Sequence, residues 1–446
     1  MPSSLGGEVR ISVIGTGYLG AVHAACMASL GHAVTGYDTD SEKVDALSRG
    51  EAPFYEPGFE ELLRSSLDSG RLRFTDDAVE AVRGAALHFI CVGTPQQSGS
   101  EAADLSFVEA ALRTVANSAD CEGLIVGKST VPVGTAQQLA HRLGANDVRL
   151  ELAWNPEFLR EGTAVHDTLH PDRLVFGVTS EYAEKTLLEV YSSIIEDGTP
   201  YITTDLATAE LVKVAANAFL ATKVSFINAM AEVCEVARAD VVTLSRALGY
   251  DARIGRRFLS AGLGFGGGCL PKDIRAFSAR AGELGASDAL TFLREIDKIN
   301  MRRRDKVVSV AGAMLGGEFL SQNVAVLGAA FKPNSDDVRD SPALNVAAAM
   351  HLKGAAVRVH DPRAIANARR QFPTLTYCAE ITDACRNADL IVLATEWDDY
   401  LAIDPHVLAK TVRHTRLLDA RNAVDHALWS EAGWSVYALG RGAFNP

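Results

Sequence analysis

The stretch that decides the fold is Arg10-Ile-Ser-Val-Ile-Gly15-Thr-Gly17-Tyr-Leu-Gly20. A short β-rich run ends there in a G-x-G-x-x-G pattern, and an Ala-rich helical stretch follows up to Leu30. A second β-rich run, 33–37, ends at Asp38. The order of strand, glycine turn, helix, strand and acidic residue predicts a βαβ unit that binds a dinucleotide.

Each part of this motif has a physical role. The glycines allow the tight turn and let a pyrophosphate approach the N-terminus of the helix. The Asp38 carboxylate is placed to accept a hydrogen bond from a ribose 2′-hydroxyl, and its charge would repel a 2′-phosphate. We therefore expect NAD rather than NADP, with contacts from Gly15, Gly17, Tyr18, Leu19, Gly20 and Asp38.

A similar pattern returns late in the chain. A β-rich run from Asn323 ends at Gly328, a helical stretch covers about 341–352, and a further β-rich run from Ala356 ends at Asp361. Later runs at 389–397 and 416–422 resemble 86–95 and 123–132 of the first half. Each half therefore predicts a doubly wound, Rossmann-like α/β domain. The second lacks G-x-G-x-x-G, so we expect it to bind something other than the dinucleotide.

The segment between the two halves, about 205–315, has few turn signals and reads as helical. With 446 residues the chain is too long for one core. We predict an N-terminal NAD-binding domain at 1–204, a central helical domain at 205–315 and a C-terminal Rossmann-like domain at 316–446. The long apolar helices of the middle domain are expected to pair with another copy, giving a homodimer or a larger assembly.

Composition narrows the class of protein. The chain has 48% hydrophobic and 22% charged residues, which is typical of soluble globular proteins. No apolar run reaches the ~20 residues that span a bilayer, and the segment 1–10 lacks the apolar stretch of a secretory signal. We therefore expect a cytoplasmic protein without a membrane partner.

The charge and the cysteines exclude further classes. A net charge of −13 disfavours nucleic acid as a partner. The one dense basic run, Arg302-Arg303-Arg304, is interpreted as a solvated helix face. The seven cysteines lack Cys-x-x-Cys pairs, which argues against a disulfide framework and against a structural zinc site. We expect thiols and no metal.

One cysteine stands out, in the run Gly264-Phe-Gly-Gly-Gly-Cys269-Leu-Pro271-Lys272-Asp273. Pro271 suits the first residue of a helix, so Cys269 would lie just before a helix N-terminus. There the helix dipole and Lys272 favour the thiolate, the nucleophilic form. A nucleophilic thiol in a chain with a hydride acceptor indicates an oxidation through a covalent intermediate. The alternative is a small buried cysteine in a tight turn.

Two further clusters leave two interpretations open. Lys213 and Asn217 lie four residues apart in an apolar helical stretch, where they form a thin solvated stripe or a structural salt bridge, or stabilise a developing oxyanion. Glu157 and Glu161 lie four apart in the stretch 155–162. They carry surface charge on a helix face, or they serve as a general base and a cofactor contact.

Taken together, these segments resemble the UDP-glucose 6-dehydrogenase family, within the UDP-glucose/GDP-mannose dehydrogenases that make uronic acids. The resemblance covers almost the whole chain. Its matching segments are 15–20, 92–95, 128–132, 155–162, 210–217, 249–255, 264–273 and 331–339.

The resemblance implies a four-electron, NAD-dependent oxidation of a nucleotide-activated glucose, in the first place UDP-glucose, at C6. The product is the uronic acid, a precursor for polysaccharides, and Cys269 carries first a thiohemiacetal and then a thioester. A water held by Lys213 and Asp273 acts as base. Glu157 activates the hydrolytic water, Asn217 and Lys213 steady the oxyanions, and Thr130 positions water.

The resemblance also implies binding residues. Further cofactor contacts are Lys43, Thr94, Pro95, Thr130, Glu161, Lys272 and Arg339. Arg253 is offered to the substrate of a neighbouring subunit. The other substrate contacts are Glu157, Phe158, Leu159, Lys213, Asn217, Phe258, Leu259, Ser260, Gly264, Phe265, Phe331, Lys332 and Arg421.

The chain departs from the usual family pattern at three positions. Gly268 stands in place of a common Ser, Leu270 in place of a Phe and Ser335 in place of a Thr. These changes leave the base and the sugar open, so dTDP-glucose, GDP-mannose and UDP-N-acetylmannosamine are alternative substrates. A non-catalytic homologue that binds a nucleotide sugar and a two-electron dehydrogenase are alternative functions.

Overall fold

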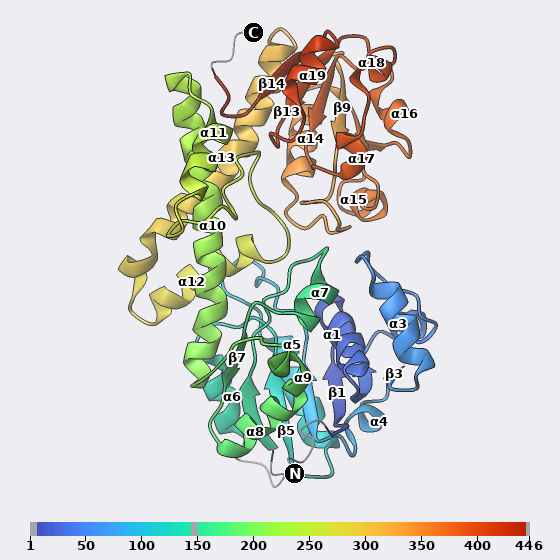
Figure 1. Cartoon of the computed structure of the whole chain (residues 1–446), viewed down its shortest axis with the longest axis vertical. Coiled ribbons are helices and arrows are strands. Elements are labelled where there is room, and N and C mark those ends of the chain that lie inside the picture. Colours follow the sequence, from blue (N-terminus) through green and yellow to red (C-terminus); the bar gives the residue numbers. More distant parts are fainter. Residues whose placement is uncertain (1–6, 144–149, 443–446) are drawn as a thin grey trace. The chain divides into compact units, whose positions relative to one another are not determined.

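The computed structural model describes residues 7–143 and 150–442 and divides the chain into two compact units, Met1–Ala216 and Asn217–Pro446 (Figure 1). Each unit contains a parallel or mostly parallel sheet with helices, so the predicted α/β class with two doubly wound sheets is confirmed. Residues 1 and 446 lie outside the described residues, and so does most of the segment 1–10, in which a secretory signal was not expected. The division into three domains stays a prediction.

The first unit is built on an eight-stranded sheet in the order β3-β2-β1-β4-β5-β6-β7-β8. Neighbouring strands run parallel except β6 and β7. The strands are β1 (Arg10–Ile14), β2 (Ala33–Tyr37), β3 (Leu72–Thr75), β4 (Leu87–Ile90), β5 (Gly123–Gly127), β6 (Leu150–Trp154), β7 (Leu174–Gly177) and β8 (Tyr201–Thr204). The helices are α1 (Tyr18–Ser29), α2 (Ser41–Ser48), α3 (Phe59–Asp68), α4 (Ala78–Val82), α5 (Ser106–Ser118), α6 (Thr135–Leu143), α7 (Ala164–Leu169), α8 (Glu181–Val190) and α9 (Ser192–Glu196).

Both faces of this sheet are buried. Successive side chains of a strand point to opposite faces, and accordingly Val13 and Ile14 belong to two different hydrophobic clusters. β4 and β5 are buried along their whole length. Such uninterrupted apolar strands are typical of parallel sheets covered by helices on both sides.

The order of the strands places a ligand site. β1 pairs with β2 on one side and with β4 on the other. The chain therefore reverses its direction of winding at β1, and ligands of open α/β sheets bind beyond the carboxyl ends of the strands at such a point. The loops that follow β1 and β4 flank this crevice.

The second unit holds helices and a six-stranded parallel sheet in the order β11-β10-β9-β12-β13-β14. Its switch point lies between β9 and β12. The strands are β9 (Asn323–Leu327), β10 (Ala356–His360), β11 (Thr376–Tyr377), β12 (Leu390–Leu393), β13 (Arg416–Asp419) and β14 (Ser435–Ala438). The helices are α11 (Val241–Gly249), α12 (Leu270–Glu283), the 3₁₀ helix Ser287–Leu290, α13 (Thr291–Met314), α14 (Pro342–Leu352), α15 (Ile365–Gln371), α16 (Ile381–Cys385), α17 (Asp398–Leu401), α18 (Pro405–Leu408) and α19 (His426–Glu431).

The long helix α10 (Leu206–Ala237) begins in the first unit and ends in the second. By length and composition alone this helix is apolar enough to cross a membrane. The expectation that no apolar run is long enough to span a bilayer did not anticipate it. Its polar side chains have partners inside the protein, however. The Glu210 carboxylate accepts the backbone N–H groups of Gly134 and Ala136, and Ser225 donates to the carbonyl of Ile296. A core helix explains this composition as well as a membrane helix does.

The interpretation of Arg302-Arg303-Arg304 as a solvated face is wrong for two of the three residues. Arg303 and Arg304 are buried, and only the Arg302 side chain is half exposed. Consecutive residues of a helix point about 100° apart, so three in a row cannot share one face. Burial lowers the pKa of Arg303, and Glu235 and Glu232 nearby partly offset this shift.

Candidate active site

The crevice of the first unit begins at the glycine turn after β1. Gly15 has a φ of +89°, and a Cβ at Gly20 would lie 1.8 Å from the carbonyl oxygen of Gly15. Both positions therefore require glycine. Beside them, α1 begins at Tyr18 with Gly17 as its N-cap, which offers no side chain to the first turn. Nothing lies within 4 Å of a Cβ built at Gly17, so the turn is open to a phosphate group there.

Asp38 lies at the end of β2 beside this turn. Its Oδ2 accepts from the backbone N–H of Thr16 at 2.8 Å and from the Lys43 ammonium at 2.9 Å. Burial by itself raises the pKa of Asp38, but these hydrogen bonds outweigh it and hold the pKa below its ordinary value. Asp38 is therefore a carboxylate at neutral pH, and its Oδ1, which accepts from Asp40 N–H, keeps a lone pair for a ribose hydroxyl. The residues present fit NAD.

Two further predicted contacts lie together at the carboxyl edge of the same sheet. Thr94, in the loop after β4, donates from its hydroxyl to the backbone carbonyl of Thr130 at 2.8 Å. Thr130 follows β5, and its neighbour Ser129 donates to the carbonyl of Val92 at 2.7 Å. These bonds fix the two loops to each other, while Pro95 is exposed.

Glu157 and Lys213 form a buried ion pair in the first unit. The Lys213 ammonium donates to Glu157 Oε1 at 2.7 Å, and Glu157 Oε2 accepts the backbone N–H of Leu159 at 2.8 Å. The Lys213 side chain is only 6% exposed and the Glu157 side chain 12%. Glu157 and Glu161 lie on an irregular loop after β6, so the interpretation of this pair as a helix face is wrong. The Phe158 ring packs between this pair and the Arg173 guanidinium.

The cysteine turn lies in the second unit. α12 begins at Leu270, one residue before the expected Pro271, and Cys269 is its exposed N-cap. In the first turn, the buried Asp273 carboxylate accepts from the Lys272 ammonium at 2.6 Å and from the Asn217 amide at 2.7 Å. An exposed thiol at a helix N-terminus, with a lysine in the first turn, has the environment of a reactive cysteine.

The glycines before Cys269 lie against the segment that follows β9. A Cβ at Gly266 would lie 2.3 Å from the Asp340 carbonyl oxygen, and one at Gly267 would lie 2.9 Å from the Phe331 ring. A Cβ at Gly268 would lie 2.3 Å from the Arg339 guanidinium carbon. The run is rich in glycine because two backbone segments approach each other closely there.

The same edge of the second sheet gathers most of the other residues predicted to contact substrate. The Arg421 guanidinium donates to the carbonyls of Gly264, Phe331 and Ala394. Leu263 N–H bonds the carbonyl of Ala420, so the loop 258–265 runs along the end of β13. Leu259 and Phe265 are buried and Ser260 is exposed; the Lys332 ammonium lies 5.5 Å from the centre of the Phe331 ring. Arg253 lies apart, exposed and paired with Asp251.

Comparison with known proteins identifies the family. Residues 9–195, 207–302 and 325–426 match the NAD binding, central and UDP binding domains of the UDP-glucose/GDP-mannose dehydrogenase family. The chain is 38% identical over 434 residues to the UDP-glucose 6-dehydrogenase of Rickettsia typhi, covering 97% of this chain and 99% of the relative. The chain belongs to the UDP-glucose/GDP-mannose dehydrogenase family.

Two solved structures agree with this assignment. A UDP-glucose dehydrogenase from Pyrobaculum islandicum superposes with a TM-score of 0.88 at 37% identity, covering 98% of this chain and 100% of the other. A UDP-D-ManNAc dehydrogenase from Pyrococcus horikoshii gives a TM-score of 0.84 at 28% identity, covering 97% and 99%. The dehydrogenase described here is thus an NAD-dependent oxidoreductase whose C-terminal sheet belongs to a UDP binding domain.

Two supporting contacts of this dehydrogenase were missed in the sequence. The buried Glu56 accepts the Tyr18 hydroxyl and the backbone N–H groups of Gly162 and Ala164, and so ties two predicted cofactor segments together. Burial, and in second place the hydrogen bond to Glu56, raise the pKa of Tyr18. A single glutamate between Tyr55 and Pro57 has no pattern that would reveal this role.

The second missed contact supports the loop that carries Glu157. The buried Lys128 ammonium donates to Asn155 Oδ1 at 2.9 Å and contacts the Tyr191 hydroxyl at 3.2 Å. Burial lowers the pKa of Lys128 to about 8. These residues line a pocket together with His23, Glu157 and Phe158. Lys128 belongs to a segment that the resemblance matched, but its burial could not be read from the sequence.

Proposed function

We propose that this dehydrogenase oxidises UDP-glucose at C6 to UDP-glucuronate, removing four electrons through a thioester on Cys269. The observation that carries this proposal is Cys269 itself, an exposed thiol at the N-cap of α12 on a loop that lies along the carboxyl edge of the UDP binding sheet. The curated relative from Rickettsia typhi is named a UDP-glucose 6-dehydrogenase. NAD, when bound, supplies the hydride acceptor for each of the two oxidations.

The chain's own groups move the protons and hold the charges. A water held by Asp273 and Lys213 takes the proton of the C6 hydroxyl as the aldehyde forms. The Cys269 thiolate attacks the aldehyde carbon, and the amide of Asn217 and the ammonium of Lys213 stabilise the resulting oxyanion. A second oxidation of this thiohemiacetal leaves a thioester. Glu157, with Thr130 positioning water, activates that water for attack, so that the carboxylate is formed and the thiolate leaves.

The arrangement of charges supports these roles. Glu157 and Lys213 already form a buried pair, so a base and an oxyanion partner lie within 2.7 Å of each other. Asp273 lies between the Asn217 amide and the Lys272 ammonium.

The decisive experiment measures NADH per nucleotide sugar, with UDP-glucose limiting. We expect two NADH, and we expect Cys269→Ser to abolish steady formation of the acid while NAD binding persists. Cys121→Ser is the matched control, because Cys121 is also exposed but precedes β5, at the amino end of that strand. Full turnover by Cys269→Ser would refute the covalent route. Binding of both ligands without any NADH would favour a non-catalytic homologue.

The sugar and the base are settled by comparing kcat/KM for UDP-glucose, dTDP-glucose, GDP-mannose and UDP-N-acetylmannosamine. The family comparison supports a UDP sugar, because the matching C-terminal domain is a UDP binding domain. The resemblance of 38% to a UDP-glucose 6-dehydrogenase favours glucose over the N-acetylated sugar of the more distant Pyrococcus horikoshii structure. A higher kcat/KM with any of the other three would correct the substrate.

The protein is further proposed to act as a cytoplasmic homodimer or larger assembly. In the second unit, α10 exposes Phe219, Phe226 and Val233, which repeat every seven residues and so share one face. Val236 continues this apolar face at 88% exposure. A second copy would cover it and could receive Arg253. We expect Phe219→Glu with Phe226→Glu to lower the molar mass measured by light scattering, whereas an unchanged mass would exclude this face as the interface.

A further inference from the structure

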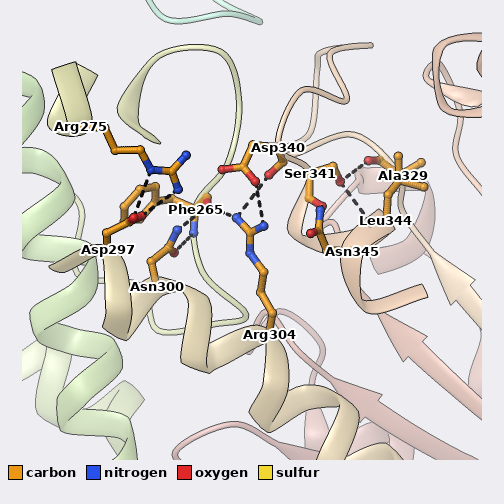
Figure 2. A network of polar contacts seen from close by, with 10 residues as sticks. All are labelled: Phe265, Arg275, Asp297, Asn300, Arg304, Ala329, Asp340, Ser341, Leu344 and Asn345. Atoms are coloured by element: carbon orange, nitrogen blue, oxygen red, sulfur yellow. Dashed lines mark hydrogen bonds and ion pairs between the residues drawn. The ribbon is translucent and has the colours of Figure 1, made fainter. Parts of the chain in front are cut away.

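Two buried polar residues of α13, Asn300 and Arg304, lie one helical turn apart and hold the glycine run before Cys269 (Figure 2). Asn300 Oδ1 accepts the backbone N–H of Phe265 at 2.7 Å, and its amide donates to the Phe265 carbonyl at 3.0 Å. Arg304 donates to the same carbonyl at 3.2 Å. Both polar groups of the Phe265 backbone are thus fixed by side chains from one helix.

The same arginine holds the segment that follows β9. Arg304 donates to Asp340 Oδ1 at 2.8 Å and approaches the Asp340 carbonyl at 3.4 Å. Asp340 adopts a left-handed conformation with a φ of +46°, which a non-glycine residue keeps only where its surroundings impose it. Ser341 follows, caps α14 and donates to the carbonyl of Ala329 at 2.6 Å. Figure 2 shows this series of contacts from Phe265 through Arg304 and Asp340 to Ala329.

Glycine has no side chain with which a loop could anchor itself. The three consecutive glycines, Gly266, Gly267 and Gly268, give the run great conformational freedom. Its backbone makes one hydrogen bond to the segment after β9, from the Gly267 N–H to the Arg339 carbonyl. The anchors must therefore come from elsewhere. Asn300 and Arg304 supply them on one side of the run, and the helical start of α12 supplies one on the other.

We propose that Asn300 and Arg304, together with Asp340, form a brace that positions the Cys269 thiol relative to the nucleotide-binding edge of the second sheet. The three are positioning residues, and the inference rests on the proposed function of Cys269. The brace keeps Cys269 at the α12 N-terminus and at a fixed offset from the β9 loop. When the brace is weakened, the substrate still binds but the aldehyde is captured less efficiently, because a displacement of ~1 Å costs about 10²-fold in rate.

The test uses Arg304→Lys, which keeps the charge but loses the forked contact to both segments, and Asp340→Asn as a milder second variant. We expect kcat to fall about 10- to 100-fold with the KM for UDP-glucose within about threefold. We further expect NADH per UDP-glucose to fall below two, with the missing aldehyde trapped by semicarbazide and identified by mass spectrometry. Loss of folded protein alone would lower the active fraction but not this ratio.

A second readout needs neither NAD nor substrate. The rate at which iodoacetamide alkylates Cys269 in the apoprotein should fall about threefold or more in both variants, because the thiol leaves the helix N-terminus. Alkylation of Cys121 in the same sample is the internal control, and Arg302→Lys is the matched variant, since Arg302 lies on α13 but pairs with Glu232.

Two outcomes would overturn the brace. One is an alkylation rate at Cys269 within about twofold of the wild type, together with two NADH per sugar, in Asp340→Asn. The other is an equal change in Arg302→Lys. If Arg304→Lys fails to fold, Asp340→Asn decides alone. Should the wild-type protein oxidise no nucleotide sugar, the proposed function fails while the alkylation rates still decide whether the brace sets the reactivity of the thiol.

Discussion

The two sheets of this dehydrogenase start with the same device and use it differently. After β1, the chain turns at Gly15 and reaches α1 through Gly17, where a side-chain position is open. After β9, it turns at Gly328, the counterpart of Gly15, with a φ of +113°, but the position that corresponds to Gly17 is Ala330, which is fully buried. The first turn leaves room for a phosphate group, whereas the second is filled by the protein's own atoms.

The acidic residues after the second strands differ in the same way. Asp38 accepts from backbone, hydroxyl and ammonium groups and keeps a lone pair on Oδ1. Asp361 accepts from the N–H groups of Ala329 and Ala330 and from the Trp397 indole through Oδ2, and from two further N–H groups through Oδ1. It is only 2% exposed. A carboxylate at this position thus keeps acceptor capacity for a ligand in one sheet, whereas in the other it is fully used to hold the protein's own segments together.

The largest contrast is expected between the two turns. Gly328→Ala should lower the free energy of unfolding of the second unit by about 4 kcal/mol, because its positive φ and the contact with Thr395 both oppose a side chain. Gly17→Ala should change stability by less than about 1 kcal/mol but raise the KM for NAD at least about tenfold. Denaturant unfolding and NAD kinetics measure the two effects. Equal stability losses would show that the position of Gly17 is not open to a side chain.

Substitution of the two carboxylates should show the same contrast, with a loss of stability in the second sheet and a loss of cofactor binding in the first. Asp361→Ala leaves buried N–H groups of Ala329, Ala330 and Trp397 without their acceptor, which costs about 3 kcal/mol of stability. Asp38→Ala should instead lower the preference for NAD over NADP about tenfold. Thermal unfolding and kcat/KM with each cofactor test this. A change of cofactor preference in Asp361→Ala would show that the second crevice also reaches the dinucleotide.

Acid should weaken the first sheet before the second. Burial lowers the pKa of His88 in β4 to about 4, so the unfolded chain binds more protons between pH 6.5 and 4 and stability falls as pH falls through that range. Burial also lowers the pKa of His23 in α1 well below its usual value. His88→Gln should recover about 2 kcal/mol of the loss between pH 7 and 5. The acid sensitivity of the two sheets is measured by hydrogen exchange of β1 and β4 peptides, compared with β9 and β12 peptides. Equal acid sensitivity of both sheets would contradict the prediction.

The smallest effect is expected at Gly268. A serine there would meet the guanidinium end of Arg339, a flexible group that can move, so stability should change by less than about 1 kcal/mol. The KM for NAD should rise a few fold, because Arg339 is a proposed cofactor contact. Gly267→Ala is the contrasting variant, since its φ of +84° and the Phe331 ring leave no such escape. A severe loss in Gly268→Ser would mean that Arg339 is fixed.

The sequence was sufficient where a local pattern has a local cause. The β-rich runs at Arg10, Asn323 and Arg416 begin strands as predicted, and the glycines and Pro271 placed Cys269 at a helix start to within one residue. Lys213 and Asn217 were recognised because polar side chains in an apolar helix need partners. The sequence could not say that these partners are Glu157 and Asp273, which lie far away along the chain.

What the sequence missed depends on tertiary packing. Arg304 and Asn300 sit in a polar stretch of α13 that gave no sign of burial, and Glu56 occurs in an unremarkable loop. The repeated Gly328 and Asp361 resembled their counterparts in the first half, and only the burial of Ala330 and the Trp397 contact to Asp361 distinguish the filled crevice from the open one. Patterns identify which residues matter, whereas partners from distant segments decide what they do.

The boundary between the compact units falls between Ala216 and Asn217, inside α10. This has a consequence for building chimeras. A chimera that takes the NAD-binding unit from a relative and is joined at this boundary would connect two fragments of one helix. A single inserted or deleted residue at the junction would rotate Asn217 about 100° away from its alignment with Lys213. Recombination that preserves both side chains must therefore cross over outside Leu206–Ala237, with α10 inherited as one uncut piece.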